Sequence, residues 1–225
     1  MKKWATALLD LVFPPRCAFC ARPGVHGVCP ACEKKLPYAE KPLREGASFG
    51  RCVSPLRYEG VVRQSLLRFK FHGGRSAAEG YAQLMAHTIA QELSGEFDCI
   101  TYVPVSDKRR RERGYDQSQL IAAELGKIWD TPPLTLLRKV FDNPPQSSLR
   151  SREERKGNVL GVYEAADAVQ IQGARVLLLD DIITTGSTLG EYGRVLRDAG
   201  AQIVVCATVA SAVDGPGEKD GKSTP

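Results

Sequence analysis

Apolar residues recur in this chain in two patterns, short continuous runs and longer stretches with helical spacing. The continuous runs predict an extended segment at 52–58 and buried strands at 99–105, 175–179 and 203–209. The periodic stretches predict helices at 61–71, 77–93, 118–129 and 188–199. Because apolar strands alternate with helices, we expect an α/β fold in which helices flank both faces of a mainly parallel sheet.

The polar and cysteine-rich segments divide the 225 residues into five parts. Residues 1–16 predict a short amphipathic leader helix, residues 17–37 hold a cysteine module, and residues 38–50 read as a linker. The alternating pattern occupies residues 51–213, which suffices for a domain with its own core. Residues 214–225 are polar, lack large apolar side chains and are predicted to be disordered.

The strand predicted at 175–179 leads into two acids and a short hydroxyl-rich loop. The loop opens the helix predicted at 188–199, so its amides and the helix dipole suit a phosphate. We assign the phosphate to Thr184, Thr185, Gly186, Ser187 and Thr188. Asp180 and Asp181 would repel a phosphate, but they suit the hydroxyls of an attached sugar or a divalent metal. The pattern therefore indicates a ribose phosphate, and a plain helix cap is the alternative.

Two other phosphate-binding motifs are missing from the sequence. It contains neither G-x-x-x-x-G-K-[ST], which marks many nucleotide hydrolases, nor the dinucleotide fingerprint G-x-G-x-x-G. Both rival classes are therefore excluded as the source of the hydroxyl-rich loop.

Cations cluster in three further segments. Five of the eight residues at 106–113 are Lys or Arg. We expect Arg109, Arg110 and Arg113 to contact a pyrophosphate or nucleic acid at a second strand end, and a solvated charged loop is the alternative. Residues 146–158 mix acids and bases, so they predict either a phosphate contact or a salt-bridged helix. Lys70 lies at the end of a predicted helix and either contacts the ligand or complements the helix dipole.

Four of the seven cysteines form two C-x-x-C pairs. Two such knuckles can supply four thiolates to one tetrahedral ion, and we expect structural zinc at Cys17, Cys20, Cys29 and Cys32. An iron–sulfur site and redox-active dithiols are the alternatives. His26 is read as an ordinary exposed residue. The scattered remaining three, Cys52, Cys99 and Cys206, are expected to be small buried apolar residues.

The net charge of +5 suits either an anionic small ligand or nucleic acid. No apolar run reaches the roughly 18 residues that a bilayer crossing needs. Asp10 and Pro14 interrupt the short apolar N-terminal run, which therefore does not read as a signal peptide. With thiols that suit a reducing compartment, we expect a cytoplasmic protein without a membrane span.

The run from Val176 to Leu189 resembles the phosphoribosyl pyrophosphate (PRPP) signature of type I phosphoribosyltransferases. The resemblance implies that Asp180 and Asp181 bind the ribose hydroxyls and that residues 184–188 hold the 5′-phosphate. It also implies the type I phosphoribosyltransferase fold and Mg²⁺ bound together with PRPP.

Five segments narrow the resemblance to the ComF family, whose phosphoribosyltransferase-like members are associated with DNA uptake and competence. They are the cysteine module, residues 69–71, residues 104–105 with 113–118, residues 146–158 and residues 180–188. Asp116 stands where that family often has Asn, and its negative charge argues against a phosphate contact. The resemblance implies either transfer of a phosphoribosyl group to a nitrogen acceptor or a non-catalytic accessory protein that binds single-stranded DNA and senses PRPP. No pocket for a base is recognisable in the sequence, so the acceptor stays open.

Overall fold

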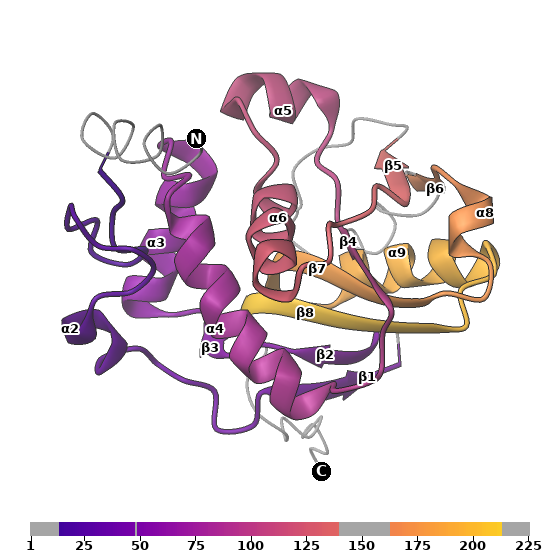
Figure 1. Ribbon diagram of the computed structural model, residues 1–225, viewed down its shortest axis with the longest axis horizontal. Helices are drawn as coiled ribbons and strands as arrows, with labels where there is room; N and C mark the ends of the chain where they lie inside the picture. Colours follow the sequence, from indigo (N-terminus) through magenta and orange to yellow (C-terminus); the bar gives the residue numbers. More distant parts are fainter. Residues whose placement is uncertain (1–13, 48, 140–162, 213–225) are drawn as a thin grey trace, which may run out of the picture.

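The computed structural model describes residues 14–47, 49–139 and 163–212, and it has the predicted α/β architecture (Figure 1). One sheet runs in the order β1 (Leu43–Gly46), β2 (Gly50–Val53), β8 (Ile203–Ser211), β7 (Arg175–Ile183) and β4 (Cys99–Tyr102). The short strand β3 (Leu56–Arg57) also pairs with β8. All the pairings are parallel except that of β1 with β2, so the expected mainly parallel sheet is confirmed.

Successive side chains of the central strand β7 pack into two different buried clusters. Leu177 and Leu179 pack with α3 (Gly60–Phe71), α4 (Ala77–Glu92) and α6 (Gln117–Trp129). Val176 and Leu178 pack on the other face with α9 (Ser187–Asp198). This alternation is what the two-residue repeat of a strand dictates, and it explains why the strand sequence is apolar without interruption.

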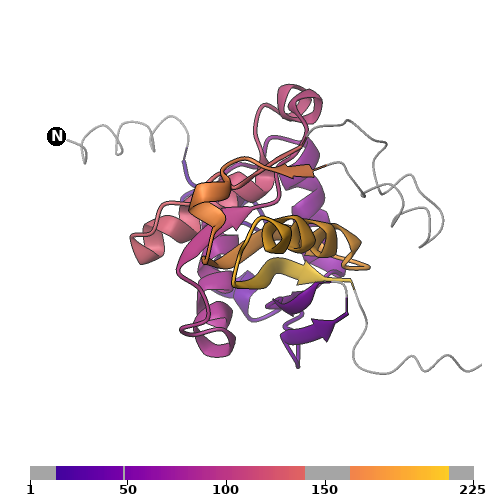
Figure 2. The ribbon, with the colours of Figure 1, turned by 90° about the vertical axis from the view of Figure 1, so that its right-hand side faces the viewer.

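The remaining elements are short. They are α2 (Pro30–Glu33), α5 (Asp107–Arg113), α8 (Ala168–Ile171) and the antiparallel pair β5 (Leu137–Lys139) and β6 (Tyr163–Ala165). The strands β5 and β6 lie near α8 and α9 at one end of the sheet (Figure 1). In both views α5 lies at the outer edge of the molecule, away from the sheet (Figure 2).

Three segments differ from the sequence-based expectation. Residues 43–46 fall in the predicted linker but form the edge strand β1. Residues 107–113 fall in the predicted basic loop but form the helix α5, which Ser106 caps by accepting a hydrogen bond from the amide of Arg109. Strand β7 continues past residue 179, because Asp180 and Ile182 stay in register with β8.

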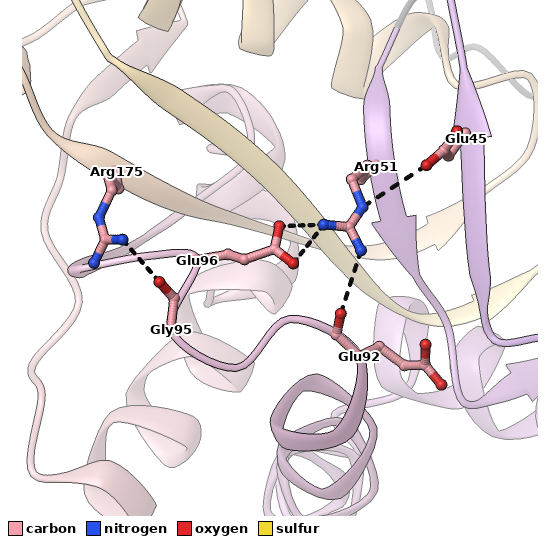
Figure 3. Close-up of polar contacts among 6 residues, drawn as sticks. All are labelled: Glu45, Arg51, Glu92, Gly95, Glu96 and Arg175. Carbon is pink, nitrogen blue, oxygen red and sulfur yellow. Dashed lines mark hydrogen bonds and ion pairs between the residues drawn. The ribbon is translucent and has the colours of Figure 1, made fainter.

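Two arginines tie the connection between α4 and β4 to the sheet (Figure 3). Arg51 on β2 binds both carboxylate oxygens of Glu96 and the carbonyl of Glu92. Arg175 on β7 donates to the carbonyl of Gly95 at 2.7 Å and pairs with Asp98. Both arginines lie at the amino ends of their strands. These contacts therefore fix the end of the sheet that is opposite the hydroxyl-rich loop.

The cysteine module packs on α3 and α4. The ring of Phe19 is buried and meets Tyr81 edge-on at 5.8 Å between centroids, and Tyr81 meets Phe69 in the same way at 5.3 Å. Ser65 and Arg68 on α3 donate hydrogen bonds to the carbonyls of Ala18 and Phe19. The module is therefore part of the main apolar core and not a separate unit.

Among the residues that the structure describes, no helix combines the length and apolar character that a membrane crossing requires. Most of the predicted leader helix, the mixed-charge segment at 146–158 and the predicted disordered tail lie outside the described residues.

Candidate ligand site at the carboxyl end of strand β7

The two acids of the predicted sugar site are the sixth and seventh of the nine residues of β7. The carboxylate oxygen Oδ1 of Asp180 accepts hydrogen bonds from Ser118 Oγ at 3.0 Å and from the amide of Asp181 at 2.8 Å. The Oδ2 of Asp181 lies 2.7 Å from the ammonium of Lys70, at the end of α3. Elements far apart in the sequence thus meet at one strand end, as ligand sites in parallel sheets do.

Burial sets the electrostatics of this cluster. Burial and the neighbouring Asp181 carboxylate raise the pKa of Asp180 to about 7, although Lys70 and hydrogen bonds from Asp181 and Ser118 oppose the shift. Burial lowers the pKa of Lys70, but the two carboxylates outweigh it and raise that pKa above its ordinary value. The cluster therefore places two carboxyl groups beside one ammonium group. This arrangement suits a polar ligand that brings a further cation with it.

The hydroxyl-rich loop joins β7 to α9. Gly186 has a φ of 74°, in the left-handed region that favours glycine, and its carbonyl accepts from the amide of Gly190 at 2.8 Å. Thr185 Oγ1 and Ser187 Oγ lie 2.9 Å apart. Within the described part of the chain, no backbone carbonyl accepts from the amides of residues 185–188. The amide of Ser187 donates to Thr185 Oγ1 at 3.4 Å, and the other donors at the start of this helix are available to an anion.

The ring of Phe49, in the turn before β2, fills the space beside Gly186. A Cβ atom placed on Gly186 would overlap this ring. Phe49 itself is 9% exposed. The glycine is therefore required both by its backbone conformation and by the side chain that packs on it.

The predicted basic residues reach the site to different degrees. Lys70 pairs with Asp181, and Arg113 donates to Gln117 Oε1 at 2.8 Å and lies over the ring of Phe71 at 5.1 Å. Burial and the positive charge of Arg109 lower the pKa of Arg113. Arg110 is an exposed residue of α5.

Asp116 has a structural role, in line with its exclusion from the phosphate site. It is 5% exposed and caps α6, because its Oδ1 accepts from the amide of Gln119 at 3.1 Å. Its Oδ2 accepts from the amide of Val105 at 2.8 Å. The carboxylate therefore fixes the turn that carries Arg113 and Gln117.

The four clustered cysteines converge on one point. Their ligand atoms all lie within 4.8 Å of one another, and the sulfurs of Cys20 and Cys29 are 3.7 Å apart. A tetrahedral zinc ion with Zn–S bonds of 2.3 Å requires sulfurs about 3.8 Å apart, so the arrangement fits zinc. The amide of Cys29 donates to the sulfur of Cys17 at 3.3 Å. Burial raises the pKa of Cys17, but amide hydrogen bonds outweigh it and lower that pKa to about 6, which favours a thiolate ligand.

The other cysteines and His26 behave largely as expected. Cys52 and Cys206 are fully buried, which confirms the expectation for these two, whereas Cys99 is half-buried and its thiol faces the carbonyl of Arg175 at 3.7 Å. His26 is exposed and lies 3.3 Å from Glu79. In the part of the chain that is described, the four clustered cysteines are the only group of three or more His, Cys, Asp or Glu side chains placed to share one metal ion.

Comparison with known families identifies the chain. The Phosphoribosyl transferase domain matches residues 84–224, and the Double zinc ribbon domain matches residues 8–48. Competence protein ComFC of Bacillus subtilis (strain 168) is 26% identical over 185 residues, 82% of this chain and 72% of that protein. The chain belongs to the ComF family of phosphoribosyltransferase-domain proteins.

Other relatives of this ComF-family protein carry related names. DNA utilization protein YhgH of Salmonella typhimurium is 29% identical over 202 residues, 84% of this chain and 86% of that protein. Competence protein F of Haemophilus influenzae is 26% identical over 213 residues, 83% of this chain and 93% of that protein.

Solved structures also align with part of the chain. Glutamine PRPP amidotransferase from B. subtilis, complexed with ADP and GMP, aligns with a TM-score of 0.39 and 26% identity. The alignment covers 59% of this chain and only 26% of that enzyme. PRPP synthetase from Mycobacterium smegmatis aligns with a TM-score of 0.39 and 18% identity, over 60% of this chain and 35% of that one.

Together with the double zinc ribbon match, the thiolate geometry supports a structural zinc ion in this ComF-family protein. A site with four protein thiolates has no open position for a substrate, so the ion would hold the short module together.

Four residues of the candidate site were not singled out from the sequence. Ser118 and Gln117 are the first residues of α6, and Phe71 ends α3 beside Lys70. These three residues lie within or shortly after the basic segments of the sequence, and this position was the signal that could have identified them. Phe49 had no signal, because it reaches Gly186 only through the packing of the β1–β2 turn against the start of α9.

Proposed function

We propose that this ComF-family protein binds PRPP at the carboxyl end of β7. Asp180 and Asp181 accept hydrogen bonds from the ribose hydroxyls, and residues 184–188 hold the 5′-phosphate. Lys70 and Arg113, with Arg109 and Arg110 on α5, face the pyrophosphate. Mg²⁺ would enter as part of the substrate, and carboxylate oxygens are ligands that it accepts.

One arrangement of groups carries this proposal: the half-buried Asp180 and the buried Asp181 lie near the carboxyl end of a central strand. The loop that follows this strand opens a helix whose first amides have no backbone acceptor among the described residues. The acids suit the sugar, the amides suit its phosphate, and the tight loop of residues 184–186 holds the two kinds of group at one place. A simple helix cap would need neither the second acid nor Lys70 paired with it.

The chemistry that suits this site is displacement at the anomeric carbon. A nitrogen nucleophile forms the new C–N bond and loses a proton, while the C–O bond to pyrophosphate breaks and its electron pair leaves with the pyrophosphate. The protein would contribute position and electrostatic stabilisation of the departing anion by Lys70 and Arg113. The names of two relatives, competence protein ComFC and DNA utilization protein YhgH, support a role for this protein in competence and DNA utilisation. We expect it in the cytoplasm, where clustered thiols remain reduced.

A second candidate function is a single-stranded DNA-binding accessory protein that uses the same loop to sense PRPP. The specific observation in its favour is Phe71, an aromatic residue 60% exposed beside the cations of α5. The guanidinium of Arg113 lies over that ring. Nucleic-acid bases stack on exposed aromatic rings, and nearby cations neutralise the charge of the phosphate backbone.

Isothermal titration with PRPP and Mg²⁺ tests the favoured function. Wild type should bind, and the double variant Asp180→Asn, Asp181→Asn should bind at least about tenfold more weakly, because hydrogen bonds to charged groups are worth roughly 1.5–3 kcal/mol each. Asp198→Asn, an exposed acid at the far end of α9, is the matched control and should bind as wild type does. Equal binding by all three proteins would refute the assignment.

A further inference from the structure

The side chain of Gln117 holds a buried donor without an acceptor. The residue is 2% exposed, and its Oε1 accepts from Arg113 Nη1 at 2.8 Å. Its amide nitrogen Nε2 is buried and has no hydrogen-bond partner among the described residues. Buried polar groups in native proteins are almost always satisfied, so an unpaired one indicates a partner outside the protein chain, either a bound ligand or an ordered water.

The orientation of this amide is fixed by its neighbour. Exchanging the oxygen and nitrogen of Gln117 would turn the NH₂ group toward the guanidinium of Arg113, and two donors would then face each other. The oxygen must therefore face Arg113, and the NH₂ group must point to something else that accepts a hydrogen bond.

The surroundings indicate what that acceptor is. Gln117 directly precedes Ser118, whose hydroxyl donates to Asp180. Its partner Arg113 lies over Phe71, which directly follows Lys70. The amide thus belongs to the end of the site where cations gather, and cations with an amide donor suit an anionic oxygen rather than a sugar hydroxyl.

We propose that Gln117 is a ligand-binding residue whose Nε2 donates a hydrogen bond to a pyrophosphate oxygen of bound PRPP. Arg113 orients the carboxamide through Oε1 and supplies positive charge to the same anion. This inference rests on the proposed PRPP site and adds one contact to it. A buried water that satisfies Nε2 permanently is the competing explanation.

The test compares Gln117→Glu with wild type in titrations with PRPP and Mg²⁺, inorganic pyrophosphate and Mg²⁺, and ribose 5-phosphate. Glutamate keeps the contact with Arg113 but replaces the donor by an acceptor. We expect binding of PRPP and of pyrophosphate to weaken about tenfold or more, and binding of ribose 5-phosphate to stay within about twofold. Gln119→Glu, two residues along the same helix, controls for the added charge.

Gln117→Met removes the donor without adding charge, and it serves if the glutamate variant does not fold. It should weaken pyrophosphate binding in the same direction. Thermal unfolding of each variant is measured alongside the titrations. A lower melting temperature with unchanged affinities for all three ligands would show that a water satisfies Nε2, and it would overturn the proposal.

The failures of the two proposals are distinguishable. If wild type binds PRPP, the Asp180→Asn, Asp181→Asn variant does not, and both Gln117 variants bind as wild type does, only the inference about Gln117 is wrong. If wild type binds pyrophosphate but not PRPP, the proposed function fails, and the response of pyrophosphate binding to Gln117→Glu still decides this contact. If wild type binds neither ligand, both proposals fail.

Discussion

The ammonium of Lys70 lies 2.7 Å from Oδ2 of Asp181, so the cation near the end of α3 meets an acid near the end of β7. Both side chains are largely buried, with 24% and 9% of their surfaces exposed. A cation is therefore already present where the sequence suggests that a sugar and its metal bind. This pair joins the helical layer to the candidate site.

Replacing Lys70 by Met should leave the carboxylate of Asp181 buried and unpaired. We expect the free energy of unfolding at pH 8 to fall by about 3 kcal/mol, because breaking one side of a buried ion pair exposes the full cost of the other charge. The double variant Lys70→Met, Asp181→Asn should recover most of that loss. Urea denaturation of the two single variants and the double variant measures the coupling, and additive effects would contradict a direct pair.

Asp180 should make the protein less stable as the pH rises. Its pKa is raised from an ordinary value near 3.8 to about 7, so the folded protein binds this proton more tightly than the unfolded chain does. Its unfavourable contribution therefore grows between about pH 4 and pH 7 and is constant above pH 7. Asp180→Asn should gain stability over wild type across that window, by on the order of 1–4 kcal/mol at pH 8, while it loses PRPP affinity.

Urea denaturation of Asp180→Asn at pH 4, 6 and 8 measures this effect, with Asp198→Asn as the control for removal of one acid. A stability difference between Asp180→Asn and wild type that does not change with pH would show that the carboxyl group is not perturbed in the folded protein.

Gly186→Ala should damage the hydroxyl-rich loop in two separable ways. A left-handed backbone costs a non-glycine residue about 1–2 kcal/mol, and the new methyl group would also overlap the ring of Phe49. Adding Phe49→Ala to Gly186→Ala should relieve the overlap but not the backbone cost. Thermal unfolding of the single and double variants separates the two terms. A Gly186→Ala protein as stable as wild type would refute this description of the loop.

The sequence alone predicts the parts of the fold and site that depend on local pattern. The central strands and the helices flanking them follow from apolar runs and helical spacing. The ligand that the acids and hydroxyls of residues 180–188 indicate stays a prediction. The cysteine spacing likewise predicts the thiolate cluster.

Features that depend on pairing between distant segments could not be predicted in this way. Strand β1 contains glycine and charged residues and pairs with β2 at the edge of the sheet, so its sequence predicted a linker. The charges of residues 107–113 concealed a helix whose signals, Ser106 as N-cap and Gly114 as a left-handed C-cap, were nevertheless present. The contact of Phe49 with Gly186 exists only through tertiary packing.

The cysteine module should hold about one zinc ion per chain. Cys20→Ser or Cys32→Ser should lose it and lower the melting temperature, because the module packs its buried Phe19 against Tyr81 in the main core. Cys99→Ser lies outside the cluster and should retain full zinc content. Elemental analysis of the purified proteins decides the matter, and iron in the wild type, or no metal, would contradict the assignment.

If the protein also binds single-stranded DNA, Phe71 should be its stacking platform. Phe71→Ala should weaken binding roughly 5- to 100-fold, as expected for loss of one stacked base, while the steep dependence on salt remains. Tyr38→Ala removes a different exposed aromatic residue, 45% exposed, and should have little effect. Fluorescence anisotropy with a labelled oligonucleotide at low and high salt measures both. Unchanged binding by Phe71→Ala would show that Phe71 is not a stacking platform for DNA.

The most direct measurement is a crystal structure of the protein soaked with PRPP and Mg²⁺. We expect density for a ribose whose hydroxyls hydrogen-bond to Asp180 and Asp181. We also expect density for a 5′-phosphate that accepts hydrogen bonds from the amides of residues 185–188. A ligand bound elsewhere, or an empty site with the Lys70–Asp181 pair intact at saturating PRPP, would contradict this prediction.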